Sequence, residues 1–123
     1  MSIDGFRSLR VWQKNKELAV KIYGITNDGK FSYDYSLRGQ IRRASVSIPS
    51  NIAEGDELGT DKQSVRHFYI AKGSSAEVLT QAIIAFEVGY IDEATFEDIE
   101  SCCTEISKML SRLITARSKS FYP

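Results

Sequence analysis

The 123-residue chain has few of the residues that build catalytic and metal sites. It contains one histidine and two cysteines, and the cysteines are neighbours, Cys102 and Cys103. Adjacent cysteines make a poor framework for stapling a fold, and a metal site would need more Cys or His at suitable spacing. We therefore expect reduced thiols, no metal, no cofactor and a cytoplasmic location.

Linkers, net charge and long apolar runs are also missing. The chain has only two prolines, 16 basic residues that balance 16 acidic ones, and a pI near 6.6. No stretch approaches the ~20 apolar residues of a membrane span, and no apolar leader opens the chain. We expect a single domain over residues 1–123, without contact with a membrane. Zero net charge weakens a nucleic-acid-binding function but does not exclude a local basic patch.

The chain is rich in helical periodicity, most informatively over residues 37–55, LRGQIRRASVSIPSNIAEG. Apolar residues recur there every three or four positions, beside a polar stripe of mostly short side chains. The stripe indicates a close contact or a buried polar network more strongly than a ligand or nucleic-acid surface. Pro49 leaves two alternatives, two short helices or one long helix kinked near Pro49, and we favour the long helix.

Three further helices are expected around this segment. They run from about Ser8 to Thr26, from about Asp61 to Val88 and onward from Asp92, with a lead-in at 1–7 and a tail at 118–123 that carries Phe121 and Tyr122. Thr60 or Asp61, Gly89 and Asp92 are the expected caps. The last helix has a heptad seam formed by Phe96, Ile99, Cys103, Ile106, Leu110 and Leu113. The pattern predicts an all-α, antiparallel up-down-up-down four-helix bundle.

Two residues of the third predicted helix invite a closer interpretation. Gly73 in a helix interior costs up to ~1 kcal/mol relative to Ala, so we expect another backbone to pass close by, most naturally the second helix. Glu77 follows one turn later and could pair with Arg43. A catalytic alternative makes Glu77 and Glu54 an acid/base pair, but nothing nearby supplies a nucleophile or metal. We expect no catalytic residues and no enzyme activity.

The central segment resembles the signature of the family of proteins encoded in intervening sequences of 23S ribosomal RNA genes, also called S23 ribosomal protein-like. The family pattern runs Leu-x-x-Gln-x-x-Arg-Ala-x-x-Ser-Ile-x-x-Asn-Ile-Ala-Glu-Gly, which this chain matches from Leu37 to Gly55. The likeness extends to Leu9-x-Val11-Trp12-Gln13 and to Ile70-Ala71-x-Gly73-Ser74-x-x-Glu77. It therefore covers nearly the whole chain.

The resemblance implies a homo-oligomer, with a pentameric ring as the expectation. The absence of a catalytic constellation favours a non-enzymatic interaction scaffold, with RNA or a protein as its expected partner. A family-signature polar network would comprise Gln40, Arg43, Ser47, Asn51, Glu54, Ser74 and Glu77. The alternative function is an RNA- or DNA-binding accessory protein, as in the related accessory variability proteins of retroelements. Its expected nucleic-acid contacts are Arg38, Arg42, Arg112, Arg117 and Lys119.

Overall fold

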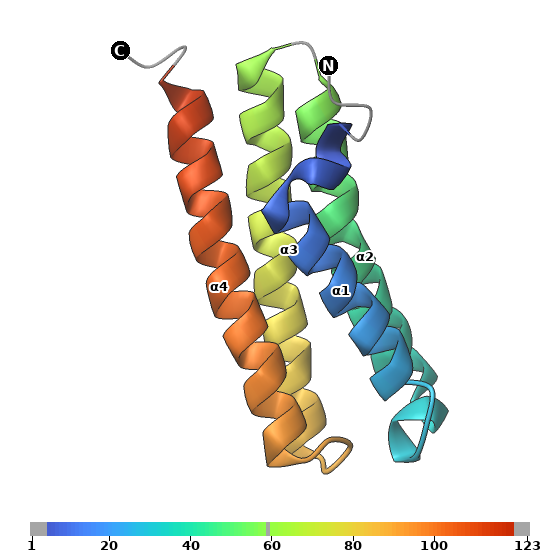
Figure 1. Ribbon diagram of the computed structural model, residues 1–123. Coiled ribbons are helices and arrows are strands. Elements are labelled where there is room, and N and C mark those ends of the chain that lie inside the picture. Colours follow the sequence, from blue (N-terminus) through green and yellow to red (C-terminus); the bar gives the residue numbers. More distant parts are fainter. Residues whose placement is uncertain (1–4, 59, 120–123) are drawn as a thin grey trace.

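The computed structural model describes residues 5–58 and 60–119, which form four long α-helices and two short 3-10 helices (Figure 1). The α-helices are α1 (Arg10–Ile25), α2 (Tyr35–Glu57), α3 (Asp61–Glu87) and α4 (Glu93–Ser118). The 3-10 helices η1 (Gly5–Ser8) and η2 (Lys30–Tyr33) precede α1 and α2. The described ranges contain no strand, which confirms the predicted all-α class.

Each helix runs antiparallel to the next one along the chain, and α1 also packs against α4 (Figure 1). The order around the bundle is therefore α1, α2, α3, α4, as predicted for an up-down-up-down bundle. This order puts the α1/α2 edge opposite the α3/α4 edge. Among the described residues, no helix is long and apolar enough to cross a membrane.

The central helix α2 continues without a break through Pro49, so the alternative of two short helices is wrong. Pro49 is itself buried, between the buried residues Ile48 and Ile52. Six residues beyond Pro49, Gly55 lies against the ring of Phe68 on α3. Tertiary packing on both sides of the proline thus holds together a helix that the proline alone would weaken.

The helix ends follow the predicted caps, with one addition. Thr60 accepts a hydrogen bond from Gln63 N, Asp92 accepts one from Thr95 N, and Gly89 has the positive φ of 84° that suits a residue after a helix. The unpredicted cap is Asp34, which accepts from Leu37 N at 3.0 Å and from the Tyr90 hydroxyl at 2.9 Å. Asp34 therefore ties the loop before α2 to the loop between α3 and α4.

The core lies between the four helices and contains mostly Ile, Leu, Val, Ala and Phe. On α4 the predicted seam is confirmed at Ile99, Cys103, Ile106 and Leu110, all buried. At its ends Phe96 is only partly buried and stacks on Phe86, while Ile114 is buried and Leu113 is not. The predicted tail residues Phe121 and Tyr122 lie outside the described residues.

Candidate interaction surfaces

The polar stripe of α2 faces α3 and is hydrogen-bonded across the seam. Ser47 Oγ lies 3.0 Å from Ser74 Oγ on α3. One turn along α2, Asn51 Nδ2 donates to Ser47 O at 2.9 Å and to Ser47 Oγ at 3.1 Å. Three of the predicted network residues thus form a continuous chain of hydrogen bonds between the two helices.

His67 of α3 extends this chain to Glu54. Its Nδ1 lies 2.9 Å from Asn51 Oδ1 and 3.3 Å from Glu54 Oε2. Both neighbours are oxygen acceptors, because the Asn51 amide nitrogen is already donating to Ser47, so we assign the proton of the neutral ring to Nδ1. His67 itself is half-buried in the seam.

The predicted network residues Gln40, Arg43 and Glu77 line a groove further along the same α2/α3 edge. We call this groove the polar groove. Its volume is about 240 Å³, and its lining includes Gln40, Arg43, Ser47, Ser74, Glu77 and Gln81. The predicted ion pair between Arg43 and Glu77 is not formed: among the described residues, neither side chain has an ion-pair partner within 4.0 Å. The predicted network is therefore linked by polar contacts from Ser74 to Glu54, whereas Arg43 and Glu77 at its other end are not paired.

The acid/base interpretation of Glu54 and Glu77 does not fit this arrangement. Glu54 lies beside His67, and Glu77 follows His67 on α3 by ten residues, or about 15 Å along the helix axis. That separation is too long for two carboxyl groups to act on one bond. Within residues 5–58 and 60–119, no three His, Cys, Asp or Glu side chains gather as a metal site would require.

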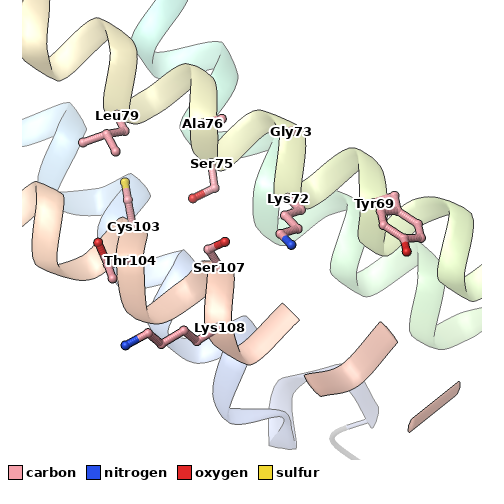
Figure 2. A pocket seen from close by; sticks show the side chains of 10 residues that line it. All are labelled: Tyr69, Lys72, Gly73, Ser75, Ala76, Leu79, Cys103, Thr104, Ser107 and Lys108. Atoms are coloured by element: carbon pink, nitrogen blue, oxygen red, sulfur yellow. The ribbon is translucent and has the colours of Figure 1, made fainter. Parts of the chain in front are cut away.

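A second groove, the α3/α4 groove, follows the seam between the last two helices and has a volume of about 610 Å³ (Figure 2). Tyr69, Gly73, Ala76 and Leu79 contribute from α3, and Thr104, Ser107 and Lys108 contribute from α4. Lys72 bridges the seam by donating to Ser111 Oγ at 2.8 Å. The groove is thus a shallow strip of small and apolar residues with lysines at its edges.

The floor of the α3/α4 groove is closed by Cys103, which is only 3% exposed. Its sulfur lies between the two helices, near Ser75 (Figure 2). Burial raises the pKa of the Cys103 thiol to about 11, and a hydrogen bond with Ser75 opposes the rise only partly. Cys103 therefore stays protonated at neutral pH, which agrees with its predicted place in the core and not with a reactive thiolate.

The prediction for Gly73 is wrong within this chain. Gly73 is exposed on the α3/α4 groove, and an added Cβ there would meet nothing within 4 Å. The glycine that does allow a close approach of α2 and α3 is Gly55, where a Cβ would lie 2.6 Å from Phe68 Cε1. No contact inside the described protomer requires a glycine at position 73.

A third groove, the α1/α2 groove, lies on the opposite edge of the bundle and measures about 480 Å³. Its lining is apolar apart from one lysine: Lys16, Ala19, Val20, Tyr23, Val46 and Pro49. Val20 and Val46 are both exposed, at 65% and 40%. Exposed apolar residues that cluster in this way on a surface commonly mark an interaction site.

The sequence matches the family model of the 23S rRNA-intervening sequence protein over residues 7–112. The chain belongs to this family. The match covers α1, α2, α3 and most of α4, so it includes all three grooves. No curated protein matches the chain.

A solved structure supports the assignment. It is a crystal structure of a protein of unknown function from the S23 ribosomal protein family of Bacteroides thetaiotaomicron. The two chains are 26% identical and superpose with a TM-score of 0.78, over 85% of this chain and 97% of the other. The bundle fold is therefore that of the family.

The five predicted nucleic-acid contacts do not come together in one protomer. Arg38 donates to Ser32 O and stacks on Tyr35, and Arg42 donates to Thr26 Oγ1 and stacks on Tyr23. Both therefore hold the α1-to-α2 connection in place.

The remaining predicted contacts lie at the other end of the bundle. Arg117 pairs with Asp56 at 3.1 Å, and Arg112 and Lys119 are exposed on α4 nearby. Asp56 is 18 residues beyond Arg38 on α2, or about 27 Å along the helix. The five predicted contacts therefore lie in two regions at opposite ends of the bundle.

Two residues of the α2/α3 edge were missed from the sequence, His67 and Gln81. His67, Ser74 and Gln81 are spaced by seven residues, which puts all three on one face of α3. Counting seven residues in each direction from Ser74, which the family signature contains, leads to both His67 and Gln81. Without that signature, polar residues seven apart on a helix look like an ordinary solvated surface, so the spacing alone did not indicate a site.

Proposed function

We propose that this protein is a self-assembling, non-catalytic interaction scaffold whose copies meet through the α3/α4 groove. The outward side of α3 supports this proposal. Tyr69, Ile70, Ile83 and Ile84 are all exposed. Between Tyr69 and Ile84, α3 has two charged residues, of which Glu77 is exposed and Lys72 is partly buried. A helix facing only water would carry charged and polar residues at these positions.

Gly73 is the single observation that carries the proposal. It lies in the middle of α3, where glycine costs up to ~1 kcal/mol relative to Ala, and nothing in the protomer lies within 4 Å of its missing side chain. A helix of a second copy that lies along the α3/α4 groove would use that space. Small residues at helix contacts let two backbones approach closely.

The two apolar grooves favour head-to-tail contacts between copies. The α1/α2 groove and the α3/α4 groove lie on opposite edges of the bundle, so they can cover each other only in neighbouring copies of a heterologous assembly. Such an interface closes into a ring when the rotation between copies permits it. A pentameric ring is the assembly that we propose, following the family resemblance.

Two chemical features support a non-catalytic role in the cytoplasm. The two candidate acid/base residues, Glu54 and Glu77, lie far apart along the helix axis, and burial keeps the thiol of Cys103 protonated. Both cysteines are free thiols, as expected of a protein from a reducing compartment.

The test compares two glutamine variants by molar mass in solution. Gly73→Gln places a long side chain in the α3/α4 groove without a clash inside the protomer, and glutamine is the better helix former. Ala94→Gln on α4 is the control, since Ala94 is also helical and exposed and lines none of the three grooves.

We expect an oligomeric wild-type protein, a smaller species for Gly73→Gln with unchanged helix content, and the wild-type mass for Ala94→Gln. A wild-type protein that stays monomeric at every concentration would refute self-assembly. An oligomer that tolerates Gly73→Gln would refute the α3/α4 groove as its interface.

The nucleic-acid alternative rests on the exposed Arg112 and Lys119 beside Arg117, which a ring would repeat around its circumference. Titration of structured RNA against the wild-type protein at increasing salt tests it. Binding through phosphates weakens with a log–log slope of ~0.7 per contact on single strands. Salt-sensitive binding that Arg112→Gln reduces would favour this alternative, and no binding at low salt would leave a protein partner.

A further inference from the structure

The polar groove between α2 and α3 contains two charged side chains of opposite sign that have no partner. Arg43 comes from α2 and Glu77 from α3, and both are exposed. Among the described residues, neither takes part in an ion pair or a hydrogen bond. By contrast, Glu54, which shares a face of α2 with Arg43, has His67 as its partner.

The floor of the polar groove has hydrogen-bonding capacity that the protein leaves unused. Ser47 and Ser74 share one hydrogen bond, which engages only one of their two hydroxyl hydrogens. Gln81 is 9% exposed, lines the groove, and its buried Oε1 has no hydrogen-bond partner. An unmatched buried acceptor is destabilising, so such a group beside a groove favours a ligand that supplies a donor.

We propose that the polar groove binds a small zwitterion of the α-amino acid class. Arg43 binds the carboxylate and Glu77 binds the ammonium group. A simple anion would be repelled by Glu77 and a simple cation by Arg43, whereas a zwitterion satisfies both charges at once. The volume of about 240 Å³ lies below the range of drug-sized pockets, which favours an amino acid over a nucleotide.

The neutral groups of the groove complete the recognition of such a ligand. A free hydroxyl hydrogen of the Ser47–Ser74 pair can donate to the carboxylate, and Gln81 can accept from the ammonium group after a small shift of its side chain. The polar groove lies on a different edge from both apolar grooves.

The test is an NMR titration of the full chain with L-alanine and L-glutamine, with acetate and methylammonium as half-ligands. We expect saturable shifts of amides near Ser47, Ser74 and Gln81 with the amino acids, and at least tenfold weaker binding of each half-ligand. Arg43→Gln and Glu77→Gln should each weaken amino-acid binding at least tenfold. Arg66→Gln and Glu87→Gln, which change exposed α3 charges outside the groove, should not.

Two further variants separate recognition from folding. Gln81→Leu removes the unmatched amide, so it should raise the melting temperature and still weaken amino-acid binding. The double variant Arg43→Glu with Glu77→Arg restores one charge of each sign but reverses the ligand relative to Ser47, Ser74 and Gln81, so it should recover only part of the binding. The proposal is overturned if no standard amino acid gives a saturable shift, if acetate binds as tightly as L-alanine, or if Arg43→Gln and Glu77→Gln leave binding unchanged.

Discussion

Helix α3 packs against α2 so closely that Gly55 leaves no room for a Cβ, whereas on its α4 side Gly73 has nothing within 4 Å. At the α2 contact, Ser64 Oγ also donates to Gly55 O, so backbone and side chain meet directly. At the α4 contact, the helices touch through Cys103 below and a lysine-to-serine bridge at the edge. The same residue type thus marks a finished contact on one side and an open one on the other.

The α2/α3 contact at Gly55 is therefore closed within one protomer, whereas the α3/α4 groove at Gly73 is open. A glycine in a finished contact is required by its neighbours, and any substitution there disturbs them. A glycine in an open contact destabilises the helix, and no close packing inside the protomer compensates for that loss. Stability measurements can therefore distinguish the two sides, because the same change should have opposite effects.

The largest expected effect concerns the floor beneath the open groove, at Cys103. Its pKa of about 11 lies above the ordinary value of 9.0, because burial disfavours the thiolate. Below about pH 9 both folded and unfolded states hold the proton, and above it only the unfolded state loses the proton. The free energy of unfolding should therefore fall as pH rises, by up to about 2–3 kcal/mol near pH 11.

Urea denaturation of wild type and Cys103→Ala from about pH 8 to about pH 11 measures this effect. The difference between their free energies of unfolding should become smaller as pH rises. Cys102→Ala is the control, because Cys102 is only partly buried and should show a smaller change. A Cys103→Ala difference that stays constant with pH would mean that water reaches the groove floor.

The next effect tests the finished contact directly. Gly55→Ala would bring a Cβ to 2.6 Å from Phe68 Cε1 and 3.1 Å from Ser64 O, so ring and backbone must both shift. We expect a loss of about 1–3 kcal/mol even after the better helix propensity of alanine, measured by thermal and urea denaturation. In a Phe68→Leu background the same change should cost less, and an equal cost would place the strain at the Ser64 carbonyl alone.

Much of this fold was predictable from sequence because its signals are local. Thr60 and Asp92 cap their helices through the backbone three residues ahead, and the α4 seam repeats within one helix. The Asp34 cap was not found, although it also bonds three residues ahead. Its second bond comes from Tyr90, which is 56 residues away.

The site residues were less predictable because their roles depend on distant neighbours. Arg42 looks like a free surface cation in the sequence, but Thr26 and Tyr23 on the preceding segment engage its guanidinium. Gly73 was assigned to the α2 contact because small residues occur on both helices. The rotation of α3 about its axis decides which glycine faces α2, and neither small-residue run reveals that rotation.

The smallest expected effect has the opposite sign and tests the open contact. Gly73→Ala adds a methyl group in free space and removes the conformational freedom that glycine gives the unfolded chain, so a protomer should gain about 0.5–1 kcal/mol. Urea denaturation at low and high protein concentration separates this gain from any effect on assembly, since only association depends on concentration. Gly24→Ala is the matched helical control and should give a similar gain at both concentrations.

A loss of stability for Gly73→Ala that appears only at high concentration would mean that a second copy already fills the groove down to the α3 backbone. A loss at every concentration would mean that the protomer itself closes over Gly73, and the two sides of α3 would then be alike.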